Sequence, residues 1–317
     1  MLWIAVGLAV LSAVGLACGT HLQSLAVVSK SEGRLSLREF SRVLRSPRWM
    51  AGLALLGAGT VCNVLALSLA PVTVVQPIGV LGLVITTILH SRHVRIPINT
   101  HTWLAIALCI GGGTLFVLAA VRYTNPALTI TERATDVVTY LLAAVVAVVS
   151  IGLLVLKDHQ LSLFYLFAAG TLYGFVAVEV KVVTVQLHAG AGSWWQNVDL
   201  INVLGLLVAA VLGGWLVQSA YASGPPELVM AGLTVVDPMV GVLVGLTVLG
   251  EAATDFGWVA GITLAACGAV SITGVRLLSR YHPEVLAALA AARAPRTGEL
   301  GIVPGSRRPV PQQPSED

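Results

Sequence analysis

The sequence alternates between long apolar stretches and short polar ones, and few charged residues interrupt the apolar stretches. Nine of them are long enough to cross a hydrocarbon core of about 30 Å as α-helices rising 1.5 Å per residue. They lie at about residues 3–28, 49–69, 71–90, 102–121, 136–156, 161–187, 199–221, 226–249 and 256–278. Because the apolar residues are continuous rather than alternating, the pattern predicts an all-α, polytopic helical membrane protein and argues against a β-barrel.

Composition supports this fold class. Of the 317 residues, 56% are hydrophobic and 10% are charged, whereas a soluble domain carries about 25% charged residues. The four cysteines all lie inside apolar stretches without CxxC or Cys/His spacing, so neither disulfides nor a zinc site is expected. The first apolar stretch lacks a positive n-region and continues past its small residues, which favours a retained helix over a secretory signal.

The distribution of basic residues predicts the orientation. Fifteen Lys and Arg residues fall in the loops after spans one, three and five and in the tail, whereas only Arg122 and Arg133 fall on the opposite side. The positive-inside rule therefore places the N-terminus outside and the C-terminus in the cytoplasm, which an odd number of spans satisfies. We expect a multi-pass protein of the cell membrane, the inner membrane of a bacterium. The preference for Arg over Lys and the heavy use of Ala, Val and Gly suggest a GC-rich bacterial genome.

Residues 34–48 are too polar to span a membrane. Arg34, Arg38, Arg42 and Arg45 share one helical face and apolar residues share the other, which is typical of a basic helix lying on the cytoplasmic leaflet. Binding of anionic lipid head groups or of a partner is one interpretation. Simple topological anchoring is the other, and we favour it.

One segment occurs twice in the sequence. Residues Ala70–Pro77 and Ala231–Pro238 are identical at five of eight positions, and in both copies a polar residue precedes a proline. The duplication predicts two transmembrane repeats, at residues 1–121 and 136–279, joined by an extracytoplasmic linker at 122–135. Residues 280–317 are expected to form a cytoplasmic tail that is mostly disordered.

Under the predicted topology the two copies cross the membrane in opposite directions. Inverted repeats with interrupted helices form binding sites near the midplane, so Pro77 and Pro238 are expected helix breaks. Asp237 falls near the middle of its span, where an isolated carboxylate must be protonated, paired with a cation or exposed to water. It is a proton-coupling or cation-binding candidate, with a structural ion pair as the alternative. Gln76 is its neutral counterpart.

The same motifs resemble the drug/metabolite transporter superfamily, EamA-like group. Thr234–Glu251, TVVDPMVGVLVGLTVLGE, is similar to the penultimate helix of that group, which ends in Leu-Gly-Glu. Leu69–Leu83 resembles the matching helix of the first repeat, and Gly170–Lys181 resembles a helix with a buried Lys. The first half has four spans instead of five, which is closer to the nine-helix NIPA-like magnesium-transporter branch and its bacterial relatives. The resemblance implies secondary transport through a central cavity.

The resemblance also favours a cavity-facing Lys181 that contacts Asp237 or an anionic substrate, although Lys181 could instead reach the outer surface. Glu179, two residues away, points to a different side of the helix and is either a cavity wall or a rim residue. Weaker candidates for the cavity are Asn63, Tyr173, His21 and Gln23. Glu251 is interpreted as the end of its helix rather than a ligand.

We therefore expect a secondary transporter that works by alternating access, coupled to protons or to the substrate's own gradient. Its expected cargo is a small metabolite, a drug or a lipid-linked precursor. The first alternative is transport of Mg²⁺ by Asp237 and Glu179, against which the charge of Lys181 argues. The second is a non-transporting membrane scaffold. No catalytic motif, cofactor, resident metal or nucleic-acid site is expected; a homodimer is left open.

Overall fold

The structure, a computed structural model, describes residues 2–30, 37–69, 78, 81–95, 99–123, 130–156, 162–188, 199–282 and 286. Within this part of the chain all regular elements are helices, so the predicted fold class is confirmed. The helices are α1 (Leu2–Val28), α2 (Leu37–Leu44), α3 (Pro47–Leu69), α5 (Leu81–Val94), α6 (Thr100–Tyr123), α7 (Glu132–Val155), α8 (Ser162–His188), α9 (Leu200–Ser223), α10 (Pro226–Thr247) and α11 (Trp258–Tyr281).

Eight of the described helices are long and apolar enough to cross a membrane. They coincide with eight of the nine predicted spans. The third predicted span, residues 71–90, is described only from Leu81 onward, as α5 with 14 residues. The first copy of the duplicated segment, including Gln76 and Pro77, lies outside the described residues, so the inverted repeat itself stays a prediction.

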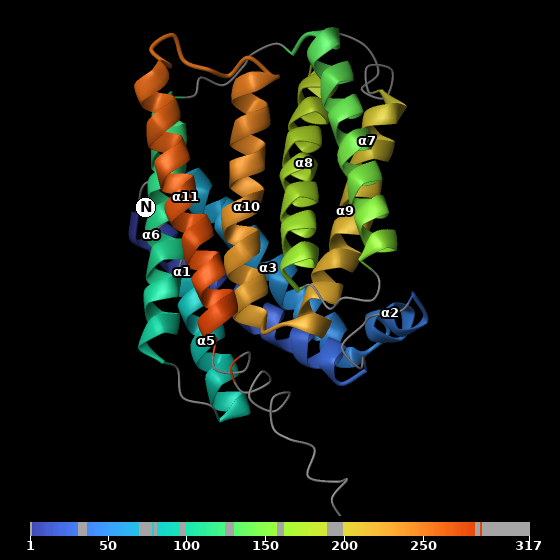
Figure 1. Cartoon of the computed structure of the whole chain (residues 1–317), viewed down its shortest axis with the longest axis vertical. Helices are drawn as coiled ribbons and strands as arrows, with labels where there is room; N and C mark the ends of the chain where they lie inside the picture. Colours follow the sequence, from blue (N-terminus) through green and yellow to red (C-terminus); the bar gives the residue numbers. More distant parts are fainter. Residues whose placement is uncertain are drawn as a thin grey trace, which may run out of the picture.

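The helices pack in pairs around α10. Helix α1 packs along α3, α6 along α11, and α8 along α9, while α10 contacts α8, α11, α5 and α6. In Figure 1, α10 stands between α11 and α8, and α1 and α3 cross behind the lower half of the bundle. Figure 1 also shows that α5 ends at the lower end of the molecule and α10 at the upper end. The second copy of the duplicated segment therefore occupies a central helix.

Two glycines allow the close approach of α8 to α10. A Cβ atom at Gly170 would lie 2.7 Å from the Cβ of Val236, and one at Gly174 would lie 2.9 Å from the carbonyl oxygen of Asp237. Both distances are shorter than van der Waals contact, so only glycine fits. The small-xxx-small spacing expected to bring helices together in lipid thus acts here next to Asp237.

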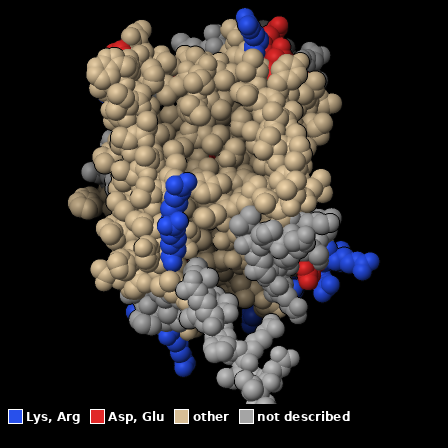
Figure 2. All heavy atoms as spheres, in the orientation of Figure 1, with Lys and Arg blue, Asp and Glu red and all other residues tan. Residues whose placement is uncertain are grey.

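Charged residues gather at the two ends of the molecule. In Figure 2 most of the visible surface is uncharged, Lys and Arg lie mainly in the lower half, where α2 lies, and one basic side chain reaches mid-height. Arg38, Arg42 and Arg45 are exposed, and the Lys30 Nζ donates a hydrogen bond of 3.0 Å to the Arg42 carbonyl. Arg34 lies outside the described residues. The lower end is therefore the end that the positive-inside rule assigns to the cytoplasm.

Candidate functional site

Asp237 lies at the middle of α10 and is half-buried. The helix continues through Pro238 without interruption, so the expected break at this proline is not present. A proline removes only one helical hydrogen bond, and a membrane helix packed against neighbours tolerates that loss. Among the described residues Asp237 forms no salt bridge and no side-chain hydrogen bond.

Tyr173 of α8 lies near this carboxylate, close enough to interact with it electrostatically. The Tyr173 ring packs on Gly213 of α9, where an added Cβ would lie 3.6 Å from the ring. A Cβ added at Gly214 would lie 3.7 Å from the Tyr173 hydroxyl. Asp237 and Tyr173, which were separate candidates in the sequence, are thus brought together between α8, α9 and α10.

A second tyrosine, Tyr221 of α9, continues this polar line toward α1. It is buried, and it lies near the side chains of Tyr173 and of Thr20 on α1. Polar side chains therefore lie between Asp237 and α1, on the other predicted repeat. Neither Thr20 nor Tyr221 was expected, because nothing in a single sequence distinguishes a hydroxyl that faces a partner from one that faces lipid.

Lys181 does not contact Asp237. Its Nζ forms an ion pair with Glu251, just beyond the outer end of α10. Gly174 marks the level of Asp237 on α8, and Lys181 is seven residues further along, which is about 10 Å at the rise of an α-helix. The expected Lys181–Asp237 contact is therefore wrong, and Glu251 is a charge partner rather than a mere helix end.

Two glycines position Glu251. Gly250 has a φ of 73°, the left-handed conformation that commonly ends helices. It turns the chain back so that the Glu251 amide donates to the Gly245 carbonyl at 3.1 Å. A Cβ at Gly245 would lie 2.5 Å from the Glu251 carboxylate. The Leu-Gly-Glu motif thus places a carboxylate beside Lys181.

Glu179 is fully buried, and neither of its carboxylate oxygens has a hydrogen-bond partner among the described residues. It faces α9, where its Oε1 lies 3.5 Å from the position of a Cβ at Gly205. One turn nearer the N-terminus of α9, the Asn202 side-chain oxygen accepts a hydrogen bond of 2.9 Å from the Thr139 hydroxyl of α7. Glu179 therefore lies between α7, α8 and α9 rather than beside Asp237.

A chain of hydrogen bonds closes the lower end of the bundle. The indole Nε1 of Trp49 donates to Gln218 at 3.1 Å, and the Gln218 amide donates to Gln23 at 3.1 Å. All three side chains are buried and come from α3, α9 and α1. Gln23 was one of the weaker candidates for the cavity; here it joins helices of the two predicted repeats.

Four imidazoles form a histidine cluster at the same end: His21, His90, His93 and His282. The His21 ring centroid lies 6.2 Å from that of His90 and 5.5 Å from that of His93. The ring centroids of His90 and His282 are 6.4 Å apart. The Nε2 of His282 lies 2.6 Å from the Glu227 carboxylate, with both side chains buried. Of the five groups, the sequence singled out only His21. Within the described residues no group of three or more His, Cys, Asp or Glu side chains has metal-binding geometry.

Asn63 is not brought into this assembly. It is half-buried on α3, which packs mainly on α1.

A cavity of about 510 Å³ lies on the other side of α10, beside its C-terminal half, and is lined almost entirely by apolar side chains such as Met239, Phe116 and Phe256. Figure 2 shows this face of the molecule hollowed near its middle.

Comparison with known proteins gives one family and several relatives. The family model described as magnesium transporter NIPA matches residues 2–190. An uncharacterized protein of Corynebacterium glutamicum is 28% identical over 271 residues, 82% of this chain and 91% of that protein. Mouse magnesium transporter NIPA4 is 27% identical over 178 residues, 54% of this chain and 43% of that protein.

A probable magnesium transporter of Candida albicans is 27% identical over 119 residues, 36% of this chain and 32% of that protein. The chain thus matches less than half of the length of these two eukaryotic relatives, whereas it matches most of the bacterial one. No solved structure matches.

Proposed function

This chain belongs to the magnesium transporter NIPA family, and from that premise we propose that it carries Mg²⁺ across the membrane. The sequence alone favoured a small metabolite, a drug or a lipid-linked precursor and kept Mg²⁺ as an alternative. The family match covers more than half of the chain, and relatives that share it are named magnesium transporters, which reverses that preference.

The observation that carries the proposal is the position of Asp237. It is a carboxylate at the middle of a central membrane helix, half-buried and without a basic partner among the described side chains. Leaving such a group uncompensated at membrane depth is unfavourable by at least a few kcal/mol. A transported divalent cation supplies the missing positive charge at the moment when it binds.

The charge of Lys181 no longer opposes this proposal. Its ammonium group is paired with Glu251 and lies about 10 Å beyond the level of Asp237 along α8. The electrostatic repulsion that Lys181 would exert on Mg²⁺ is therefore compensated locally. The pair leaves Asp237, like Glu179, as an unbalanced charge among the described residues of the bundle.

Mg²⁺ loses its water reluctantly and is commonly held by one or two carboxylates while it keeps several waters. We infer that Asp237 binds the hydrated ion and that the Tyr173 hydroxyl accepts a hydrogen bond from one of its waters. Gln76 remains the predicted contribution of the first repeat. Alternating access then exposes this site to one side of the membrane at a time.

The test uses the purified full-length chain in liposomes that contain a fluorescent Mg²⁺ indicator. We expect Asp237→Asn to lower Mg²⁺ flux by at least about tenfold, which corresponds to a lost interaction of about 1.4 kcal/mol. Asp255→Asn is the matched control, because Asp255 is exposed and paired with Arg122. Flux through Asp237→Asn equal to that of wild type would remove Asp237 from the mechanism.

One observation supports the second candidate, transport of a small apolar or amphipathic molecule. The 510 Å³ cavity beside Met239 is of the size that holds drug-sized ligands and has a largely apolar lining. The same liposomes separate the two functions. Wild-type vesicles that pass no divalent cation under any imposed gradient would overturn the Mg²⁺ proposal and leave this one.

A further inference from the structure

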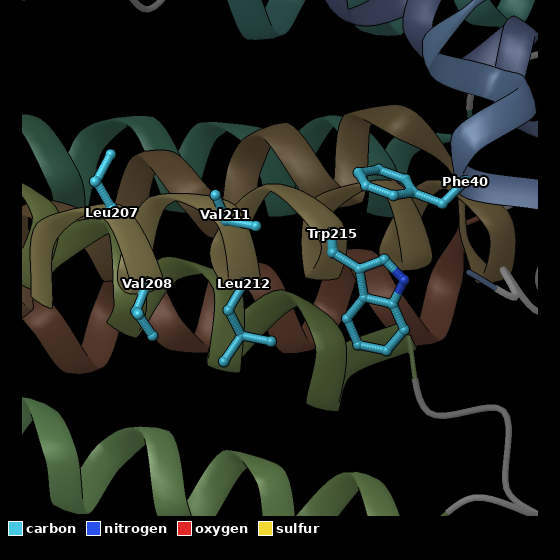
Figure 3. Close-up of a pocket in the computed structure, with 6 residues that line it drawn as sticks. All are labelled: Phe40, Leu207, Val208, Val211, Leu212 and Trp215. Carbon is cyan, nitrogen blue, oxygen red and sulfur yellow. The ribbon is translucent and has the colours of Figure 1, made fainter. Parts of the chain in front are cut away.

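A second cavity lies on the membrane-facing surface, between α2 and α9. Its volume is about 650 Å³ and its walls are entirely apolar or aromatic. Figure 3 shows five side chains of α9 in one stripe and a phenylalanine from α2 at one end of it. The lining residues are Phe40, Leu207, Val208, Val211, Leu212 and Trp215.

The stripe has the helical spacing that puts all five α9 positions on one face. Leu207 and Trp215 are eight residues apart, which is about 12 Å along the helix. α9 runs from Leu200 to Ser223, so the groove extends from the interior of the membrane toward the cytoplasmic end. Phe40 closes it there. The groove therefore has the length and polarity of a segment of lipid acyl chain.

The lining presents no polar atom to the groove. Trp215 contributes its ring, as Figure 3 shows, while its indole Nε1 is buried beneath the surface. A polar group inside the groove would find no hydrogen-bond partner there, which is unfavourable, so an acyl chain is the part of a lipid that fits.

Beyond Phe40 lies the basic face of α2. Arg38, Arg42 and Arg45 are exposed on the side of the helix opposite Phe40, and Val43 on the Phe40 side is buried. This is the arrangement of an amphipathic helix at the membrane–water interface, where long guanidinium side chains reach neighbouring lipid phosphates. Glu39 is the one acidic residue of its first turn, so α2 keeps a net positive charge.

We propose that this groove binds one anionic phospholipid of the cytoplasmic leaflet. An acyl chain fills the groove along Leu207 and Val211, and the head group lies beside the arginines of α2. A zwitterionic lipid has a phosphate but no net charge, so it gains less from the basic face than an anionic lipid does. A second copy of the chain would not need the basic face. The site is independent of the transported cargo.

The experiment is native mass spectrometry of the purified full-length chain, titrated with phosphatidylglycerol or phosphatidylcholine. We expect one phosphatidylglycerol to remain bound in preference to phosphatidylcholine. Replacing Arg38, Arg42 and Arg45 by Gln should reduce that preference at least about tenfold, since each basic residue near an anionic surface contributes a factor of roughly five. Val211→Trp should abolish retention by filling the middle of the groove, and Leu207→Trp should abolish it by filling the end away from Phe40.

Two controls match these variants. Val148→Trp adds the same bulk at a position of α7 that is 67% exposed, and Gln at Arg276 and Arg280 removes basic charge at the cytoplasmic end of α11. Both controls should retain the lipid. Equal retention of the two phospholipids by wild type, unchanged retention in Val211→Trp, or a dimer that excludes lipid would each overturn the proposal. If Val211→Trp does not fold, Leu207→Trp and the comparison of lipids still decide.

Discussion

The charged residues within this membrane protein differ in how their charge is compensated. Lys181 and Glu251 neutralise each other, Glu227 lies against His282, and Asp237 and Glu179 have no basic partner among the described side chains. In a medium that solvates ions poorly, the compensated residues hold the fold together and the uncompensated ones are candidates for function. This distinction decides which substitutions should affect stability and which should affect flux.

Lys181→Met should destabilise the protein. The Lys181 and Glu251 side chains are 36% and 14% exposed, so removing the Lys leaves a mostly buried carboxylate unpaired at a cost of about 1–3 kcal/mol. The doubly exchanged variant, Lys181→Glu with Glu251→Lys, should recover most of the loss. Thermal unfolding in detergent measures both effects.

The control for that pair is Arg122→Gln, which breaks an ion pair whose side chains are 68% and 51% exposed. Exposed pairs contribute about 0–1 kcal/mol, so its melting temperature should hardly change. If Lys181→Met melts like wild type, the pair has no structural role.

Glu179→Gln should lower transport flux and leave stability almost unchanged. The two side chains have almost the same shape, so stability should change by no more than about 0.5 kcal/mol. Flux in liposomes should fall at least about tenfold, because a fully buried acid without a partner is functional by default in a membrane. Normal flux with lowered stability would instead identify Glu179 as a packing residue.

Sequence reasoning located intramembrane charges but not their partners. Asp237, Lys181 and Glu179 stand out because each interrupts an apolar run. The partner of Lys181 is 70 positions away, beyond a helix end, and that of His282 is 55 positions away. Such pairings depend on how helices are placed against one another, which a hydropathy pattern does not contain.

At the scale of the helix, the C-terminal turn of α10 connects a sequence motif to a charge pair. Gly250→Ala should destabilise the protein by about 1–2 kcal/mol, because a φ of 73° is unfavourable for a residue with a Cβ. It should also displace Glu251 from Lys181, so its effect should be less than additive with that of Lys181→Met. Thermal unfolding of the two single variants and the double variant tests this; full additivity would contradict it.

Gly257→Ala is the matched control for the same loop. No atom lies within 4 Å of the position that its Cβ would occupy, and its φ of −116° is accessible to any residue. Its stability should therefore change little. A loss as large as that of Gly250→Ala would show that the loop, rather than the left-handed glycine, is responsible.

The helices themselves were largely predictable. Predicted spans at 49–69, 102–121 and 136–156 correspond to Pro47–Leu69, Thr100–Tyr123 and Glu132–Val155. Hydropathy predicts them because lipid requires about 20 continuous apolar residues. The continuity of α10 through Pro238 was not predictable, because neighbouring helices, rather than the proline alone, decide whether a membrane helix is interrupted.

At the scale of the whole molecule, polar contacts between the predicted repeats concentrate at the lower end in Figure 1, which the positive-inside rule assigns to the cytoplasm. Gln23 of α1 contacts Gln218 of α9, Thr20 lies near Tyr221, and His90 of α5 lies beside His282 at the end of α11. The hollow of the visible face lies higher, near its middle (Figure 2). We infer that these contacts form the inner gate, closed in this conformation, and that alternating access requires them to separate.

A short bifunctional thiol cross-linker between Gln23→Cys and Gln218→Cys should therefore stop transport, and a reductant that cleaves the linker should restore it. The four native cysteines are free thiols and are first replaced by Ser. Thr139→Cys with Asn202→Cys is the matched control: these positions are also in contact, but both belong to the second predicted repeat and should move together. Liposome flux before and after reduction is the measurement. If the Gln23–Gln218 linkage leaves flux intact, the cytoplasmic end does not open there, and the inner gate must be sought at the histidine cluster instead.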